Sequence, residues 1–216
     1  LKGELLWKRD LGRLDIKHDH GEGSSPALFG ETLVITLDHE GQSALVALDT
    51  KSGKTLWRSM VEEDNAMHAG AFSSPVLATL AGVPQLVVQS RSSLAGLSIQ
   101  DGSQLWSVPV RSFRGMNILT PAIVGSSVFT STYGGRAPLF DVQVGDQGWT
   151  VESRWDSGMQ AYMSSPVIVK GYAFMFLKSN RFACINLETG DEAWTSPPTG
   201  DDYWSLVLQG ERILAL

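Results

Sequence analysis

A tryptophan returns along this 216-residue chain at intervals of 43 to 50 residues, and each copy lies four residues after a glycine. The five copies are Trp7, Trp57, Trp106, Trp149 and Trp194, which follow Gly3, Gly53, Gly102, Gly145 and Gly190. A period of this length indicates one supersecondary unit that is repeated along the chain. The sequence therefore predicts an array of similar units, each packed on its neighbours, rather than one central core.

A second marker, a proline preceded by Ser or Thr, recurs at Pro26, Pro75, Pro121 and Pro166. Three short β-rich runs lie between each proline and the next tryptophan, and the tryptophan carries a fourth run. Four strands in about 45 residues is the size of a propeller blade. We predict an all-β propeller of four-stranded antiparallel blades. It forms a single domain over residues 1–216, with blades at approximately 24–58, 73–107, 119–150 and 164–195 and partial blades at both ends.

The turn before each tryptophan strand has its own pattern. Asp49, Asp141 and Asn186 each stand four residues before a glycine. A short Asp or Asn side chain can accept hydrogen bonds from nearby backbone N–H groups, and the glycine tolerates positive φ. The second unit has Ser98 at the equivalent position, and we expect its turn to be the weakest of the four.

The run from Ala47 to Trp57 closely resembles the tryptophan-docking repeat of β-propellers of the pyrroloquinoline-quinone (PQQ) type, and the five registered copies extend this resemblance over nearly the whole chain. In that family the tryptophan clasps one blade to the next. The resemblance implies a structural docking role for Trp7, Trp57, Trp106, Trp149, Trp194, Gly53, Gly102, Gly145, Gly190, Asp49, Asp141 and Asn186. The family contains PQQ-dependent dehydrogenases and also propellers that bind no quinone, among them BamB-type lipoproteins of outer-membrane barrel assembly. Fold membership alone does not choose between them.

The two ends of the chain do not complete a ring. Residues 5–7 are expected to form the last strand of one blade, and residues 212–216 lie inside the second strand of another. A ring closed from these pieces would lack a strand, and an open ring would leave exposed sheet edges. We therefore expect a segment of a longer propeller with six to eight blades.

Composition narrows the choice of partners and location. The formal net charge of −6 argues against nucleic acid, because phosphate binding relies on clustered Lys and Arg. No apolar run approaches the roughly 20 residues that span a bilayer, so no transmembrane segment is predicted. The lone Cys184 is interpreted as a small buried hydrophobe. The family resemblance implies a periplasmic or otherwise extracytoplasmic, bacterial location.

The long connections from an outermost strand to the next innermost strand are the variable parts of the repeat, and variable loops on a rigid scaffold commonly carry binding. They should open around a channel mouth on one face. The candidate ligand-binding residues there are His20, Glu22, His68, Arg114, Asn117, Gln160 and Tyr162. The two histidines and Glu22 are potential metal ligands or proton-transfer groups, and Arg114 is a potential anion contact. The alternative is that the histidines cap strand ends. No catalytic residue and no metal site is assigned.

Two functions of different class follow. The first is a non-catalytic extracytoplasmic propeller, without a cofactor, that binds a protein, peptide or glycan partner. The second is part of a PQQ-dependent dehydrogenase that oxidises alcohols or sugars and requires PQQ and Ca²⁺. Many alcohol dehydrogenases of the resembled family place a disulfide of adjacent cysteines against the quinone, and this sequence has no such pair. An accessory domain of an enzyme is a third possibility.

Overall fold

The computed structural model describes residues 3–12, 23–38, 43–62, 71–201 and 203–216. In these residues it contains four four-stranded antiparallel sheets and one two-stranded sheet. The first sheet consists of β1 (Ala27–Phe29), β2 (Thr32–Leu37), β3 (Ser43–Asp49) and β4 (Thr55–Glu62). The second consists of β5 (Val76–Leu80), β6 (Val83–Gln89), β7 (Ser93–Ser98) and β8 (Gln104–Pro109). The third consists of β9 (Ala122–Val124), β10 (Ser127–Phe129), β11 (Ala137–Gly145) and β12 (Gly148–Ser157). The fourth consists of β13 (Val167–Val169), β14 (Tyr172–Leu177), β15 (Arg181–Asn186) and β16 (Glu192–Thr195). The fifth pairs β17 (Leu206–Gln209) with β18 (Arg212–Ala215).

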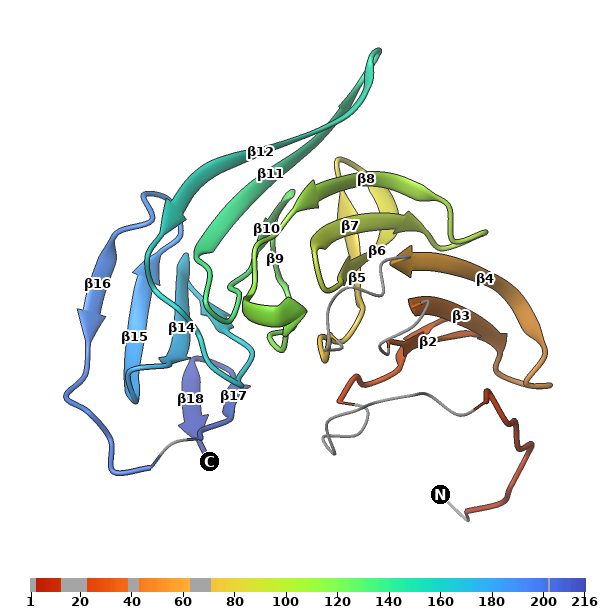
Figure 1. Cartoon of the computed structure of the whole chain (residues 1–216), viewed down its shortest axis with the longest axis horizontal. Helices are drawn as coiled ribbons and strands as arrows, with labels where there is room; N and C mark the ends of the chain where they lie inside the picture. The colour runs from red at the N-terminus through yellow and green to blue at the C-terminus, as the bar shows by residue number, and fades with distance from the viewer. Residues whose placement is uncertain (1–2, 13–22, 39–42, 63–70, 202) are drawn as a thin grey trace.

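Each sheet is a meander in which the strands lie in sequence order. The sheets stand side by side in an arc, with β4, β8, β12 and β16 along its convex side (Figure 1). On the concave side β1 contacts β5, β9 contacts β13, and β13 contacts β17. This is the blade arrangement of a propeller, as the repeat predicts. Residues 3–12 lie at one end of the arc without forming a strand, so the expected strand over residues 5–7 is absent. No helix among the described residues could cross a membrane.

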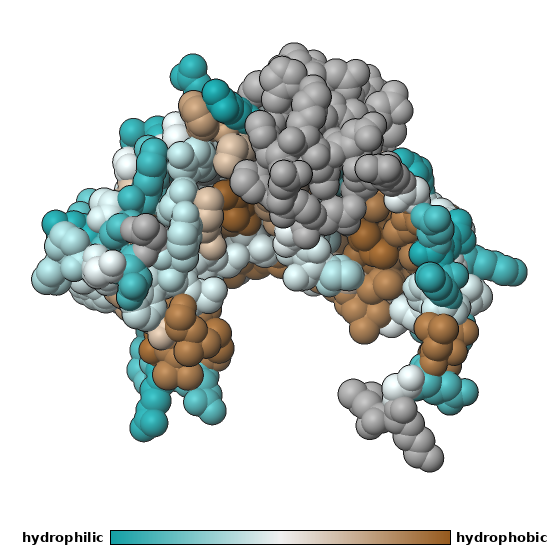
Figure 2. Space-filling model, turned by 60° about the horizontal axis from the view of Figure 1, so that its bottom comes forward, coloured by the Kyte–Doolittle hydropathy of each residue, from teal (hydrophilic) through white to brown (hydrophobic). Residues whose placement is uncertain are grey.

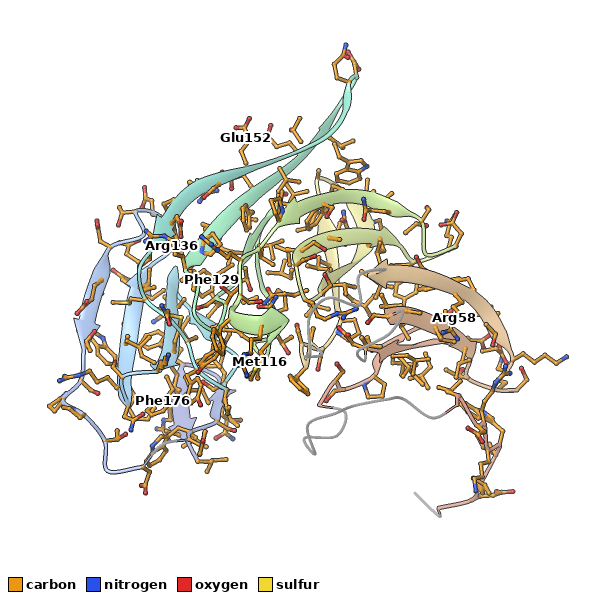
Figure 3. All side chains as sticks on the ribbon, viewed as in Figure 1. Arg58, Met116, Phe129, Arg136, Glu152 and Phe176 are labelled. Carbon is orange, nitrogen blue, oxygen red and sulfur yellow. The ribbon has the colours of Figure 1, made fainter. Side chains whose placement is uncertain are left out.

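The core is a series of interfaces between neighbouring sheets. Leu45 of the first sheet shares one apolar cluster with Leu86 of the second. Phe129 on β10, which is labelled in Figure 3, is fully buried in the cluster that it shares with Met175 of the fourth sheet. Middle strands such as β3 are covered on both faces, which explains why they are continuously apolar rather than alternating. At the ends of the arc apolar atoms reach the surface (Figure 2), and there Leu5, Leu6, Val207 and Leu214 are exposed.

The clasp between the first and second sheets follows the predicted docking geometry. Trp57 donates a hydrogen bond from Nε1 to the carbonyl oxygen of Ile99 at 2.9 Å, and its ring lies over Gly102. A Cβ atom at Gly102 would come within 2.6 Å of that ring, and the glycine has φ +72°. Position 102 therefore requires glycine for two reasons, the left-handed backbone and the lack of space. Trp7 makes the same contacts with Thr50 and Gly53.

The turn that receives Trp7 is closed as the sequence predicts. Asp49 Oδ1 accepts hydrogen bonds from the Ser52 backbone N–H at 2.7 Å and from the Ser52 hydroxyl. These bonds lower the pKa of the Asp49 carboxyl below its usual range. In the fourth sheet Asn186 Oδ1 accepts from the Glu188 N–H at 2.8 Å. Ser98 Oγ accepts only a longer bond, 3.2 Å, from the Gln100 N–H.

The docking prediction is wrong for Trp149 and Gly145. Trp155 lies over Gly190 instead, and its Nε1 donates to the Leu187 carbonyl oxygen at 2.9 Å. The reason is that the hairpin of β11 and β12 continues beyond the position where the other sheets turn. Trp155 pairs with Leu139, as Trp57 pairs with Ala47 in the first sheet, so Trp155 occupies the docking position.

The extended hairpin produces a different junction between the second and third sheets. Nothing lies within 4 Å of a Cβ at Gly145, so Trp106 does not dock there. Trp106 donates instead to Gln85 Oε1 of its own sheet at 2.5 Å. Trp149 packs against the apolar cluster that contains Trp106, so the third sheet reaches back over the second.

Asp141 and Trp194 also differ from the docking prediction. The Asp141 carboxylate forms an ion pair with Arg154 at 2.6 Å and accepts from the Ser127 hydroxyl, so it stabilises the middle of a strand pair and opens no turn. Trp194 is 46% exposed and contacts Phe174 of its own sheet. Its indole N–H has no hydrogen-bond partner among the described residues.

Candidate functional site

One face of the arc is built from interlocked loops, which we call the loop face. It comprises the connections between sheets, residues 110–121, 158–166, 196–201 and 203–205, and the hairpin loops at residues 90–92, 130–136 and 178–180. The two kinds of loop are joined by backbone hydrogen bonds, such as Thr199 N to Asn180 O at 2.7 Å and Phe113 N to Tyr133 O at 2.6 Å. These bonds fix the side chains that the loops carry.

The connection after β8 forms a projecting turn, the 3₁₀ element η1 (Phe113–Gly115). Arg114 at its centre has φ 53° and ψ 28°, a left-handed conformation that is uncommon for a residue with a side chain. Phe113 is 49% exposed, and the Arg114 guanidinium carbon lies 5.1 Å from the centre of its ring. The turn thus presents an aromatic ring and a cation together on the loop face.

The turn is held from below by Gly115 and Asn117. Gly115 is buried, and a Cβ at this position would lie 3.0 Å from Arg91 Cβ. Asn117 is fully buried and donates from Nδ2 to the Ser90 carbonyl oxygen at 2.6 Å. The backbone carbonyl oxygen of Asn117 accepts a hydrogen bond from the Phe72 N–H at 2.7 Å. The structure therefore places Asn117, a predicted ligand-binding residue, in the scaffold beneath the surface.

A buried ion pair links the first two sheets under the same turn. The side chains of Arg91 and Asp38 are 3% and 4% exposed, with Nε and Oδ1 3.5 Å apart. Ser43 bridges them, because its hydroxyl donates to Asp38 Oδ1 at 2.6 Å and accepts from Arg91 Nη2 at 3.1 Å. Asp38 Oδ2 also accepts from the Ala71 N–H at 3.0 Å. Buried charges that are hydrogen-bonded in this way fix the relative position of the elements that carry them.

Four aromatic rings follow one another across the loop face, and we call them the aromatic row. Phe113 meets Tyr133 edge to face at 5.6 Å, Tyr133 lies 5.4 Å from Tyr162, and Tyr162 stacks on Tyr203 at 6.0 Å. The Lys178 ammonium lies 4.7 Å from the centre of the Tyr133 ring. Tyr203 is 61% exposed. The row connects loops of three consecutive sheets, which are far apart in the sequence.

The structure places Tyr162 in this row and Arg114 over its Phe113 ring. Gln160 lines an open depression of about 610 Å³ together with Lys178 and Arg181. His20, Glu22 and His68 lie outside the described residues. In the part of the chain that the structure describes, no three His, Cys, Asp or Glu side chains are grouped so that they could hold a metal ion.

Sequence reasoning missed Phe113, Tyr133 and Lys178. The prediction considered only the connections between blades, whereas Tyr133 and Lys178 belong to hairpin loops between the second and third strands of a blade. Both kinds of loop open onto the same face in an antiparallel meander, so counting strands would have found them. Cys184 is buried as predicted, and its burial raises the pKa of the thiol.

Four-stranded meanders arranged side by side and joined by docked tryptophans define a β-propeller of the tryptophan-docking class. The chain belongs to the family described as outer membrane protein assembly factor BamB, whose model matches residues 2–196.

Two curated relatives carry the same description. The chain is 29% identical over 178 residues to outer membrane protein assembly factor BamB of Burkholderia pseudomallei, with 78% of this chain and 42% of the relative covered. It is 26% identical over 199 residues to that of Nitrosomonas eutropha, with 86% and 44% covered. The chain thus spans less than half the length of either relative.

Solved structures support the fold. BamB from Moraxella catarrhalis matches with a TM-score of 0.56 at 18% identity, over 77% of this chain and 49% of that one. A europium-containing methanol dehydrogenase matches with a TM-score of 0.65 at 12% identity, over 89% and 50%. At these identities the likeness concerns the propeller fold alone, so it does not bring the dehydrogenase activity with it.

Proposed function

We propose that this chain is part of a non-catalytic, extracytoplasmic β-propeller that binds a protein partner through the Phe113–Arg114 turn and the adjoining aromatic row. The observation that carries the proposal is the turn itself. It holds a half-exposed aromatic ring and a guanidinium in a conformation fixed by the scaffold below. The proposal includes no cofactor.

The chemistry of the surface suits protein recognition. Aromatic and Arg side chains dominate the energetic centres of protein interfaces. Because the turn and the row are already ordered by hydrogen bonds and ring contacts, less conformational entropy is lost on binding. Arg114 and Lys178 each lie over an aromatic ring, and neither makes an ion pair with another described residue. A partner with acidic groups beside apolar ones would complement this surface.

Family membership supports the location and the class of partner. The family and the two bacterial relatives are described as assembly factors for outer membrane proteins. We therefore place this chain outside the cytoplasm at the bacterial outer membrane, with a protein of the assembly machinery as its partner rather than a glycan or a free peptide.

Photo-crosslinking in the organism that encodes the chain tests this proposal. A photoreactive residue replaces Phe113 in one variant, and in the control it replaces Val144, which is 43% exposed on the β11 and β12 hairpin. We expect the first variant to form an adduct with a component of outer-membrane protein assembly and the control to form none. Identical adducts from both positions, or no such component at position 113, would contradict the proposal.

A further inference from the structure

A pocket of about 410 Å³ lies between the second and third sheets, where the connection after β8 meets the loop before β11. One part of its wall is apolar and includes Val110, Pro138 and Phe140. Two cationic residues, Arg111 and Arg136, also line the pocket. Pockets of this size, apolar with a few fixed polar groups, are typical of small-ligand sites.

The sequence Tyr133-Gly134-Gly135-Arg136 shapes this pocket. Thr132 Oγ1 donates to the Arg111 carbonyl oxygen at 2.5 Å, which brings the loop against the connection after β8. A Cβ at Gly135 would collide with both of these oxygen atoms, so only glycine permits the approach. Gly134 has φ +72° and lies against Phe113. The two glycines thus serve a close loop–loop contact, and the backbone that carries both arginines is fixed.

The two arginines differ in whether their guanidinium group has a partner among the described residues. Arg136, which is labelled in Figure 3, donates from Nε to Asp156 Oδ2 at 2.7 Å and from Nη2 to the Asp156 carbonyl oxygen at 2.9 Å. Nη1 of Arg136 makes no hydrogen bond with another described residue. The Arg111 guanidinium makes no hydrogen bond or ion pair with any other described residue. Because Asp156 is already engaged by Arg136, the pocket carries an excess positive charge.

We propose that this pocket binds a carboxylate that is attached to an apolar group. Arg111 receives the carboxylate, Arg136 Nη1 supplies a second donor, and the apolar wall takes the hydrocarbon part. Planar guanidinium groups match carboxylate geometry, and such charge-assisted hydrogen bonds are stronger than neutral ones. The chemistry is shared by a free small acid, the C-terminus of a peptide and an acidic side chain next to an apolar one. This site goes beyond the proposed function, since it requires neither Arg114 nor a folded partner.

The test is a titration of the 216-residue chain, followed by NMR, with N-acetylphenylalanine and with its primary amide. The two probes differ only in the carboxylate. We expect the acid to bind with a dissociation constant on the order of 0.1–1 mM. The amide should bind at least about tenfold more weakly, because it lacks the charge-assisted hydrogen bonds. Arg111→Gln should cause the same loss for the acid, and Arg114→Gln, the matched control on the neighbouring turn, should not.

Equal binding of acid and amide, no binding of the acid, or unchanged binding by Arg111→Gln would overturn the proposal. Because Arg111 is exposed, circular dichroism of the variant should match that of the parent chain. N-acetyl-Ala-Phe with a free C-terminus and N-acetyl-Asp-Phe amide then distinguish the sources. Tighter binding of the first peptide indicates that the natural ligand is the C-terminus of a peptide, and tighter binding of the second indicates an acidic side chain. If N-acetylphenylalanine binds and neither peptide does, the natural ligand is a small acid. Loss of crosslinking at position 113 with normal titration would contradict the proposed function alone.

Discussion

Trp155 lies so close to Gly190 that a methyl group on the glycine would come within 2.6 Å of the indole ring. The contact joins the third sheet to the turn of the fourth, and the indole N–H bonds to Leu187 in the same turn. The inter-sheet clasp therefore depends on the absence of a side chain at one position.

Gly190→Ala should destabilise the chain more than Gly171→Ala, its matched control. Both glycines lie in the fourth sheet with nearly equal φ, +79° and +80°, so both variants incur the left-handed backbone cost. Only Gly190 faces an indole, whereas a Cβ at Gly171 meets nothing within 4 Å. We expect the difference in free energy of unfolding between the variants to be about 1–3 kcal/mol, measured by urea denaturation. Equal losses would show that Trp155 does not clasp the turn.

Asp38→Ala should be strongly destabilising, because Asp38 belongs to the buried ion pair beneath the loop face. Removal of one partner from a buried ion pair typically costs about 3–5 kcal/mol, because the other charge stays buried without compensation. The control is Asp156→Ala, which removes the exposed ion pair with Arg136 and should change stability by about 0–1 kcal/mol. Thermal unfolding of the two variants measures the contrast. A small loss of stability in Asp38→Ala would mean that water or a structural rearrangement solvates the buried charge of Arg91.

The ion pair of Asp141 with Arg154 predicts a pH-dependent contribution to stability. Hydrogen bonding from Arg154, and then from Ser127, holds the pKa of the Asp141 carboxyl below its ordinary value of 3.8. The folded state therefore favours the ionised form, and its stabilisation is complete above pH 3.8 and lost as pH falls below it. Asp141→Asn should lower the melting temperature at pH 7, and this loss should become smaller as the pH falls below 3.8. A difference that stays constant over this range would contradict the assignment.

Arg114→Glu should weaken partner binding without lowering stability. The exposed guanidinium lies over the Phe113 ring and makes no hydrogen bond or ion pair with another described residue, so little folding energy depends on it. Reversal of its charge places like charges against an acidic partner, and we expect a loss of about tenfold or more in affinity. Co-purification with the partner identified by crosslinking, alongside thermal unfolding, measures both effects. Glu152→Gln, on the exposed face of β12, is the control and should bind normally.

The sequence repeat predicted the sheets well because docking glycines and turn residues are local requirements. Gly53 and Gly102 need positive φ and an open space for an indole, and only glycine meets both needs. The third sheet escaped the prediction for a local reason as well. Gly145 and Trp149 have the same four-residue spacing as the other glycine–tryptophan pairs, but both lie in the extended hairpin of β11 and β12. Trp155 is identified as the docking residue only by its pairing with Leu139.

The surface was harder to predict than the fold. Arg114 and Tyr162 stand in connections whose position follows from counting strands. Their neighbours Phe113 and Tyr133 come together through a backbone hydrogen bond between two loops, and no spacing in the sequence encodes that bond. Asn117 is the opposite case. It lies in a predicted binding loop, but its side chain is buried and hydrogen-bonded to the backbone of a neighbouring loop.

The reach of the β11 and β12 hairpin over the second sheet changes how the repeat can fold and evolve. In an array of similar units, stability is approximately the sum of unit terms and nearest-neighbour coupling terms. Between the first and second sheets, and again between the third and fourth, a tryptophan of one unit enters the turn of the next. Between the second and third sheets, Trp149 instead packs against the apolar cluster that contains Trp106. The two units therefore contribute side chains to one common cluster. They should exchange amide hydrogens as one cooperative block, and neither blade could be swapped for another copy of the repeat without its partner.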